Sequence, residues 1–379
     1  MHILISPNAF KNSLDAEAAA HAIARGFQQS RLDCTTTPIP VGDGGDGTGI
    51  LLTKALGGIF IEETVSDPLG RKVKASFGWI EKEQTAIIEM ASASGLRLLI
   101  PDEYDTLHAS SYGTGELIKY ALDKDAGKIL LCVGGSATVD GGCGILQALG
   151  VRFLDAKGHL LNKIPEQLPE LDKIDLSGID QRINHCECII LCDVNNPLLG
   201  EAGAAKIFGP QKGASGNDVL HLENALMQFS RIIQRDFQID ITSMQHGGAA
   251  GGVSAGLFAL IGAKLVKGID EFLDMTGFDA ALAEADLVIT GEGSLDLQTL
   301  EGKAPFGVAL RAKKMNKPVI ALAGKTPHQP IPELQEWFDR ILDINDGSSD
   351  KNALAETARN LGRTAKQLGN ELAGKQKNQ

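Results

Sequence analysis

Three glycine-rich segments of this 379-residue chain carry acidic side chains, and each follows an apolar, strand-like run directly or nearly so. They span residues 42–48 (GDGGDGT), 134–142 (GGSATVDGG) and 291–296 (GEGSLD). Glycine lets backbone N–H groups approach a phosphate closely, whereas carboxylates repel a bare phosphate and attract its metal ion. Three such segments at the ends of predicted strands are typical of an enzyme that transfers a phosphoryl group to a small molecule.

The small residues of the first two segments are candidates to hold phosphate oxygens. The second segment lies between a predicted buried strand and a predicted helix, where backbone N–H groups can cradle a phosphate at the helix N-terminus. The alternative interpretation is a purely structural turn. The candidates are Gly44, Gly45, Gly134, Gly135, Ser136, Gly141 and Gly142.

Acidic residues at the predicted strand ends divide into two roles. Because Mg²⁺ usually binds only one or two carboxylates together with phosphate oxygens and water, not all of the acids can be ligands. We predict Glu292 and Asp296 as the metal ligands. Another carboxylate must accept the proton of the acceptor hydroxyl, and Asp193 and Asp43 are the two candidates. A single loop aspartate more often makes a turn or caps a helix, which is the alternative for each of these residues.

Lysines near the glycine segments are of interest because an anionic substrate would meet a chain that is acidic as a whole. The formal net charge is −12, which argues against nucleic acid as a partner. An anionic substrate would therefore need local cations. Lys11, Lys212 and Lys303 are the candidates, and a solvated surface position is the alternative for each.

Three familiar motifs match only literally. Gly42, Gly44 and Gly47 fit the dinucleotide-binding spacing, but two aspartates inside the loop would face the pyrophosphate. Residues 324–326 (GKT) end like a P-loop, yet the first glycine of that motif is missing. Residues 252–256 (GVSAG) resemble a nucleophile elbow without the strand that must precede it. A nicotinamide-dependent oxidoreductase remains the less favoured enzyme class, and a non-catalytic sugar-acid binding protein is another.

The six cysteines indicate a reducing compartment. They show no C-x-x-C spacing, and most lie in apolar strand-like runs, so we expect buried thiols in a cytoplasmic protein and no zinc site. The N-terminal residues predict a first strand, not a signal peptide, and no apolar run approaches the roughly 20 residues of a membrane span. We therefore expect no membrane partner, and the oligomeric state stays open.

Elements that must position these residues alternate between strands and helices. Strands are predicted at 2–6, 36–41, 128–133, 188–192, 287–290, 318–323 and 340–343, and a meander of short antiparallel strands at 62–65, 72–80 and 85–90. Helices are predicted at 14–28 with Ser13 as N-cap, 49–55, 115–122, 141–149, 218–236, 280–284 and 302–315, and at the C-terminus with apolar positions from Leu354 to Leu372.

This rhythm predicts an α/β protein with a doubly wound, mainly parallel sheet and a second, inserted α+β domain. The Rossmann- or flavodoxin-like domain would combine residues 1–57, 110–150 and 280–379, and the inserted domain residues 58–109 and 151–279. The cleft between two such domains is the expected ligand site.

Six strings of the sequence together resemble a known family. They are 6–11 (SPNAFK), 41–48 (VGDGGDGT), 134–142, 192–200 (CDVNNPLLG), 208–214 (FGPQKGA) and 291–303. In this order, over nearly the whole chain, they are similar to the bacterial glycerate kinase family, and FGPQKGA is rare enough to be specific. The chain departs from the family's common residues at Asn8 (Asp), Asp46 (Glu), Val139 (Asn) and Ser294 (a basic residue).

The resemblance implies an enzyme that uses ATP and Mg²⁺ to phosphorylate D-glycerate in a cleft between two α/β domains. The usual product in the family is 2-phosphoglycerate, and some relatives are described as forming the 3-phosphate. The matched strings also imply Ser6 and Lys11 as site residues. Lys11 joins Asp193 and Asp43 as a predicted catalytic residue.

Overall fold

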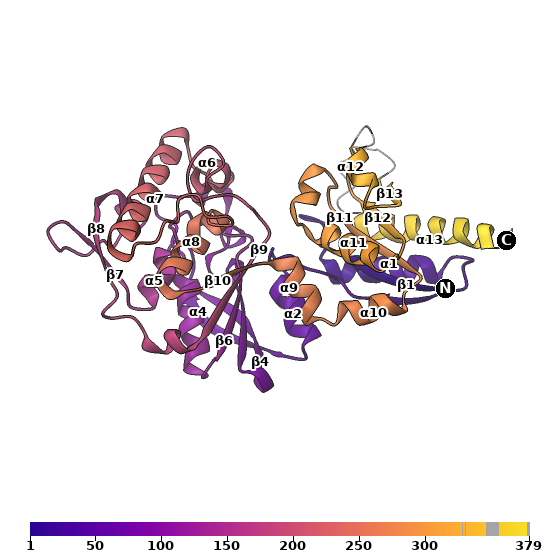
Figure 1. The fold of residues 1–379 in the computed structure, drawn as a ribbon, viewed down its shortest axis with the longest axis horizontal. Coiled ribbons are helices and arrows are strands. Elements are labelled where there is room, and N and C mark those ends of the chain that lie inside the picture. Colours follow the sequence, from indigo (N-terminus) through magenta and orange to yellow (C-terminus); the bar gives the residue numbers. More distant parts are fainter. Residues whose placement is uncertain (328, 330, 346–355, 377–379) are drawn as a thin grey trace. The chain divides into compact units, whose positions relative to one another are not determined.

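The computed structural model describes residues 1–327, 329, 331–345 and 356–376, and these residues form two compact units. Unit 1 comprises Met1–Asp43 and Ile269–Gln379, and unit 2 comprises Gly44–Gly268 (Figure 1). Each unit has its own sheet and its own buried apolar core. Leu354, which we placed in the C-terminal helix, and residues 377–379 lie outside the described residues.

Unit 1 is built on a five-stranded sheet in which every neighbouring pair is parallel. The order is β13-β12-β11-β1-β2. In sequence order these are β1 (His2–Pro7), β2 (Thr35–Pro38), β11 (Leu287–Glu292), β12 (Val319–Ala323) and β13 (Arg340–Asp343). Counted within the unit this is the flavodoxin-like order 2-1-3-4-5, whose ligand crevice forms outside the carboxyl ends of the two strands where the order reverses. Those strands are β1 and β11.

Helices complete unit 1, and a close contact between two of them depends on glycine. They are α1 (Ala16–Gln28), α9 (Gly268–Met275), α10 (Phe278–Glu284), α11 (Ala304–Lys314), α12 (Pro332–Gln335) and α13 (Thr357–Gln376). α13 packs along α1, and a Cβ at Gly26 would overlap the carbonyl oxygen of Gly362. The cap of α1 is Asp15, which accepts a hydrogen bond from the N–H of Ala18 at 2.7 Å, so the helix begins two residues later than predicted. Ser13, the predicted cap, instead donates to the hydroxyl of Thr357.

Unit 2 is built on a six-stranded mixed sheet, β10-β9-β6-β5-β4-β3. Its strands are β3 (Ile59–Ser66), β4 (Lys72–Ile80), β5 (Thr85–Glu89), β6 (Lys128–Cys132), β9 (Glu187–Cys192) and β10 (Lys264–Lys267). β5, β6, β9 and β10 run parallel, whereas β3, β4 and β5 form the predicted antiparallel meander. A separate antiparallel pair joins β7 (Arg152–Asp155) to β8 (Leu171–Asp175).

The helices of unit 2 are α2 (Thr48–Ala55), α3 (Ala91–Ser94), α4 (Tyr112–Asp123), α5 (Cys143–Ala148), α6 (Ala204–Phe208), α7 (Gly216–Phe237) and α8 (Ala249–Ile261). The side chain of Ser215 caps α7 by accepting from the N–H of Asp218, and the carboxylate of Asp218 accepts a hydrogen bond from the Ser215 N–H, forming a capping box. Unit 2 also contains the 3-10 helices η1 (Glu81–Glu83), η2 (Leu96–Leu98), η3 (Pro101–Glu103), η4 (Leu168–Glu170), η5 (Gln181–His185) and η6 (Pro210–Lys212), whereas η7 (Leu297–Glu301) belongs to unit 1.

The α/β class with mainly parallel sheets is confirmed, whereas the division of the chain differs from the predicted one. Residues 110–150 were assigned to the domain of the chain termini, but β6 pairs with β5 on one side and β9 on the other. Residues 44–57 also belong to unit 2, because α2 packs on β4 and β5. The chain therefore leaves unit 1 at Asp43, inside the first glycine segment, and returns at Ile269.

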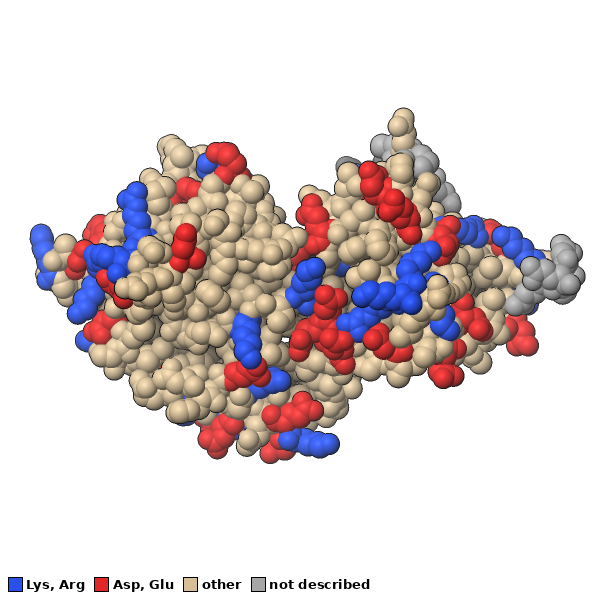
Figure 2. Space-filling view, in the orientation of Figure 1, with Lys and Arg blue, Asp and Glu red and all other residues tan. Residues whose placement is uncertain are grey.

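The surface of the chain mixes charges of both signs. Figure 2 shows acidic and basic side chains interspersed over the face in view. Some exposed basic side chains are paired with acids, for example Arg182 with Asp180 at 2.7 Å and Lys264 with Glu187 at 2.6 Å. Among the helices that the structure describes, none is both long and apolar enough to cross a membrane.

Candidate active-site residues

Unit 1 places several predicted site residues at the carboxyl ends of β1 and β11. Ser6 lies in β1, and its carbonyl oxygen accepts a hydrogen bond from the hydroxyl of Thr290 at 2.8 Å. The Ser6 hydroxyl oxygen is buried and has no partner among the described residues. Directly after β1, the N–H of Asn8 donates to the carbonyl oxygen of Gly291 in β11 at 2.8 Å. The two strand ends are thus tied together at the crevice that the strand order defines.

Asp43 is a buried carboxylate held in place by unit 1. It is 6% exposed and accepts hydrogen bonds from the Asn8 amide at 3.0 Å and from the backbone N–H of Ala304 at 3.2 Å. Ala304 is the first residue of α11, so the positive end of that helix also faces Asp43. Asn8 therefore acts as a donor that orients the carboxylate of the predicted base.

Glu292, the last residue of β11, is the most perturbed acid of unit 1. It is 7% exposed and accepts a hydrogen bond from the Thr299 hydroxyl at 2.8 Å. Burial raises the pKa of Glu292 to about 7, and the charge of Asp43 adds to the rise, whereas Lys303 and Lys11 oppose it. The structure therefore brings together a predicted metal ligand, a predicted base and two of the predicted lysines.

The second predicted metal ligand has a structural task as well. Asp296 caps η7, accepting a hydrogen bond from the N–H of Gln298 at 2.9 Å, and lies 4.0 Å from the ammonium of Lys303. The described residues contain no group of three or more histidine, cysteine, aspartate or glutamate side chains arranged around a metal position. Mg²⁺ needs only one or two carboxylates beside phosphate oxygens. The Thr299 hydroxyl donates to Glu292 and accepts from the N–H of Asp296 at 3.2 Å, so the two predicted ligands share a neighbour, and two carboxylates match that donor number.

In unit 2 the first two glycine segments lie against each other. The N–H of Gly134 donates to the carbonyl oxygen of Gly44 at 3.1 Å. Gly44 has φ +98°, and a Cβ there would overlap the carbonyl oxygen of Leu191 in β9, so only glycine fits. Gly45 follows directly. Three predicted phosphate-binding glycines therefore lie at the carboxyl ends of β6 and β9.

Only some backbone N–H groups of the second glycine segment, residues 134–142, are available to bind a phosphate. The N–H groups of Gly135 and Ser136 make no hydrogen bond within the part of the chain that the structure describes. In contrast, the N–H of Gly141 donates to Gly251 at 3.0 Å, and that of Gly142 to the Asp140 carboxylate at 3.0 Å. Gly141 and Gly142 are thus committed to folding contacts, which favours the structural interpretation for them.

Asp140 is a buried carboxylate that the motif analysis did not single out. It is 0% exposed and accepts four hydrogen bonds: from the N–H and hydroxyl of Ser111, at 2.8 and 2.7 Å, and from the N–H groups of Gly142 and Gly144. These bonds fix the turn into α5 to the start of α4. An aspartate directly before a glycine pair and a helix was the available signal, because acids favour helix N-termini.

Lys212 is buried beside the second segment. It ends η6, is 3% exposed, and donates to the Ser136 hydroxyl at 2.8 Å and to the Thr138 carbonyl oxygen at 2.7 Å. Burial lowers the pKa of Lys212 to about 7, and the charge of Asp140 only partly opposes this. Both bonds hold the segment that carries the free Ser136 N–H, so Lys212 braces this segment from inside.

The remaining predicted residues are more open. Asp193 directly follows β9 in unit 2 and is half-buried, so the two candidate bases belong to different units. Lys11 is exposed, and Lys303 is the N-cap residue of α11 with its side chain 28% exposed. Asp46, inside the first segment, forms an ion pair with Arg97 at 2.8 Å.

Features that sequence analysis interpreted as structural are so in the fold. Residues 252–256 lie within α8, where Ser254 is buried against the thiol of Cys192, so there is no nucleophile elbow. None of the six cysteines forms a disulfide, and burial raises the pKa of Cys188 and of Cys192 to about 12. Gly324 directly follows β12, and its N–H donates to the backbone carbonyl oxygen of Glu292, which continues the pairing of β12 with β11.

One unit with an all-parallel sheet and one with a mixed sheet carry acids, lysines and glycine segments at the carboxyl ends of parallel strands, an arrangement typical of an α/β enzyme. Comparison with known proteins specifies which one. The sequence pattern of the glycerate kinase family matches residues 3–373. The chain therefore belongs to the glycerate kinase family, and it is a kinase.

Individual relatives agree over almost their full lengths. The chain is 42% identical to glycerate 2-kinase of Escherichia coli K12, covering 91% of this chain and 90% of that protein. It is 43% identical to the glycerate kinase of Haemophilus influenzae Rd, covering 99% and 100%. A crystal structure described as glycerate kinase 2 from Salmonella typhimurium LT2 matches with a TM-score of 0.84 at 41% identity, covering 100% and 99%.

Proposed function

We propose that this enzyme transfers the γ-phosphoryl group of ATP to the 2-hydroxyl of D-glycerate, with Mg²⁺ as the metal ion. The observation that carries the proposal is the 42% identity, over nine-tenths of both chains, to a protein named glycerate 2-kinase. The Haemophilus relative is named only as a glycerate kinase, so phosphorylation at the 3-hydroxyl is the alternative product. Six cysteines without a disulfide fit the cytoplasm as the place of action.

The transfer requires a proton acceptor and groups that stabilise the charge of the phosphoryl oxygens. The bond from the γ-phosphorus to its bridging oxygen breaks while a bond to the glycerate oxygen forms, and ADP leaves. The hydroxyl proton moves to a carboxylate, for which Asp193 and Asp43 are the candidates. Developing charge on the phosphoryl oxygens needs fixed donors and cations.

Residues of both units are proposed for these tasks. In unit 2, the N–H groups of Gly135 and Ser136 are free to donate to phosphate oxygens, and Lys212 fixes their position. In unit 1, Lys11 and Lys303 supply positive charge. Glycerate's own carboxylate requires such charge as well. The cleft between two domains, expected from the sequence, stays a prediction.

Glu292 and Asp296 are proposed to hold the metal ion, which would neutralise phosphate charge when bound. The structural support is strongest for Glu292. A carboxylate whose pKa is raised to about 7 by burial is stabilised in its ionised form by a cation. Asp296 would have to offer the oxygen that does not cap η7.

Two other classes make different predictions. A nicotinamide-dependent oxidoreductase would change the absorbance of its cofactor when glycerate is added and release no ADP. A non-catalytic sugar-acid binding protein would bind glycerate equally well with and without ATP and Mg²⁺.

The test is ADP formation from ATP with D-glycerate and Mg²⁺, with the product examined by ³¹P NMR. We expect ADP release that depends on glycerate and a phosphomonoester whose phosphorus couples to the C2 proton. Coupling to the C3 protons would instead establish the 3-phosphate. ADP release no greater than in the glycerate-free control would refute the proposed substrate.

A further inference from the structure

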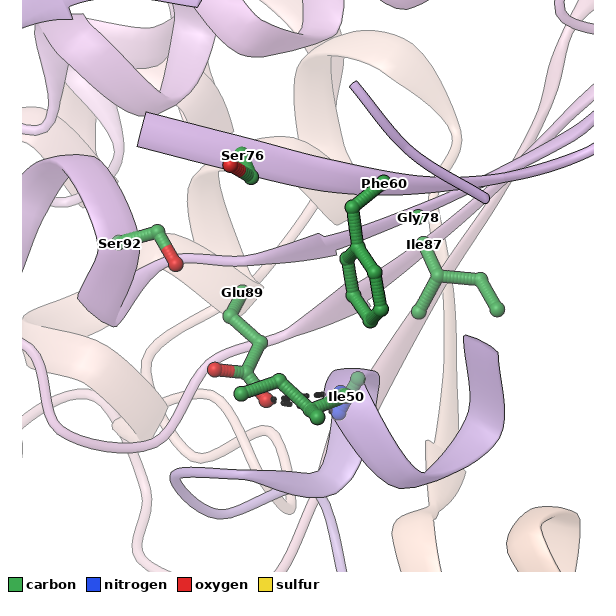
Figure 3. Close-up of a pocket in the computed structure, with 8 residues that line it drawn as sticks. Ile50, Phe60, Ser76, Gly78, Ile87, Glu89 and Ser92 are labelled. Atoms are coloured by element: carbon green, nitrogen blue, oxygen red, sulfur yellow. Dashed lines mark hydrogen bonds between the residues drawn. The ribbon is translucent and has the colours of Figure 1, made fainter. Parts of the chain in front are cut away.

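A cavity of about 310 Å³ lies within unit 2, apart from the residues discussed so far. Its walls come from α2, β3, β4, β5 and the start of α3, so residues 49–92 build it alone (Figure 3). The lining residues are Gly49, Ile50, Phe60, Ser76, Gly78, Ile87, Glu89 and Ser92. Most of this surface is apolar, with one carboxylate among it.

That carboxylate belongs to Glu89, the last residue of β5, which is 5% exposed. Oε1 accepts hydrogen bonds from the N–H groups of Gly49 at 2.8 Å and Ile50 at 3.3 Å, at the start of α2. Oε2 is buried and has no partner among the described residues. Figure 3 shows this second oxygen turned away from α2. Helix capping therefore accounts for one oxygen of Glu89 and leaves the other in need of a donor.

The cavity walls offer apolar surface to a ligand. Phe60 is 47% exposed and Ile50 41% exposed, although both are large apolar side chains. In Figure 3 the Phe60 ring and the side chains of Ile50 and Ile87 lie around the same space as the Glu89 carboxylate. An aromatic face beside an unpaired acceptor suits a flat heteroaromatic ring that carries a hydrogen-bond donor.

The cavity adjoins the proposed phosphate-binding segments. α2 begins at Thr48, directly after the first glycine segment, so the helix that lines the cavity continues that segment. At the other end, the N–H of Met90 donates to the carbonyl oxygen of Cys132, two residues before Gly134. Burial, and next the charge of Asp46, raise the pKa of Glu89, so Asp46 is close enough to act on it. A ligand with both a ring and phosphates could therefore use both places.

We propose that this cavity binds the base of the nucleotide, an aminopurine whose ring contacts Phe60 and whose exocyclic amine donates to Oε2 of Glu89. The inference rests on the proposed function for the identity of the nucleotide. Adenine offers an amine at the 6-position, whereas hypoxanthine has a carbonyl oxygen there, which would face the carboxylate oxygen without a proton between them. Glu89 would thus select ATP over ITP.

Glu89→Gln tests this selection. Its amide oxygen can still accept from Gly49 and Ile50, while its NH₂ group can donate to the 6-carbonyl of hypoxanthine. We expect the ratio of kcat/KM for ATP to that for ITP to fall at least tenfold in the variant. If Glu89 only caps α2, both values fall together and the ratio is unchanged, which would overturn the proposed base contact.

Phe60→Ala tests the ring contact independently and is expected to fold, because Phe60 is half-exposed. We expect its KM for ATP to rise about tenfold while its KM for D-glycerate stays within twofold. The matched control is Leu220→Ala, an apolar side chain on α7 that is 61% exposed and lies outside the cavity; both KM values should be unchanged. An unchanged KM for ATP in Phe60→Ala would overturn the inference.

Adenosine binding separates this inference from the proposed function. Saturation-transfer NMR should show transfer to the H2 and H8 protons of adenosine with the wild-type protein and a clear loss with Phe60→Ala. Adenosine signals without glycerate phosphorylation would refute the substrate and leave the base site standing. Phosphorylation of glycerate with equal adenosine signals in both proteins would refute the base site and leave the kinase standing.

Discussion

Replacing Lys212 with methionine should change how the stability of unit 2 depends on pH. The wild-type ammonium is almost completely buried, and its pKa falls from 10.5 to about 7. Between these two values the unfolded chain binds more protons than the folded chain, so the free energy of unfolding rises with pH in that window. Methionine keeps most of the volume and cannot titrate, so the variant lacks this rise.

The size of the effect follows from one proton. A group that is charged when unfolded and neutral when folded contributes about 1.4 kcal/mol per pH unit. Between pH 7 and pH 9 the stability of the wild type should therefore gain roughly 2 to 3 kcal/mol over the variant. The variant also leaves the buried Thr138 carbonyl oxygen without its donor, a loss of about 1–3 kcal/mol that does not depend on pH.

Urea unfolding followed by tryptophan fluorescence can measure this in unit 2 alone. Trp79 lies in β4 of unit 2 and Trp337 in unit 1, so Trp337→Phe in every sample leaves Trp79 as the reporter. Subtracting the free energy of unfolding of Lys212→Met from that of the wild type at each pH removes the contributions of the other titrating groups. Lys267→Met, at an exposed lysine that ends β10, is the control and should show a flat difference. If the difference in the free energy of unfolding between the wild type and Lys212→Met also does not change with pH, the lowered pKa of buried Lys212 is refuted.

Three further outcomes test other parts of the structure. Gly26→Ala should destabilise unit 1 by about 1–3 kcal/mol despite the better helix propensity of alanine, because its Cβ would overlap α13; Gly216→Ala, at an open position on α7, should cost nothing, and equal urea midpoints would contradict the packing argument. Glu292→Gln should stabilise unit 1 at pH 8 by roughly 3 kcal/mol, since a pKa raised from 4.5 to about 7 makes the folded carboxylate costly above pH 7, and this gain should vanish near pH 4.5, as urea unfolding with Trp337 as reporter would show. Asp193→Asn should lower kcat by roughly 10²–10⁴ with the KM for ATP nearly unchanged if Asp193 is the base, and retained turnover would remove it from that role.

The sequence predicted where chemistry could occur because strand direction can be read locally. An apolar run followed by glycine and an acid marks the carboxyl end of a strand, and parallel strands bring such ends to one edge of their sheet. Glu292, the last residue of β11, and Gly134, just after β6, were predicted in this way, and both lie at the carboxyl ends of their strands. The flavodoxin-like or Rossmann-like order was also within reach, since alternating strands and helices allow few topologies.

Partners far apart in the chain could not be predicted by the same reasoning. Whether the N–H of Gly141 is free depends on the carbonyl oxygen of Gly251, more than 100 residues away in a stretch with no strand or helix pattern of its own. The assignment of residues 110–150 depended in the same way on the pairing of β6 with β9. A repeated rhythm of strands and helices does not say which sheet a strand joins.

Buried charge marks the difference between the two kinds of acid in this chain. Asp140 is fully buried and accepts four hydrogen bonds, so its charge is satisfied and it serves the fold. Glu292 and Glu89 are almost as deeply buried but hold few donors, and burial raises the pKa of each. A fold gains nothing from leaving such acids incompletely paired, since a buried acceptor without a donor costs stability. We therefore expect ligands, a metal ion at the first and a nucleotide base at the second, to supply the missing partners.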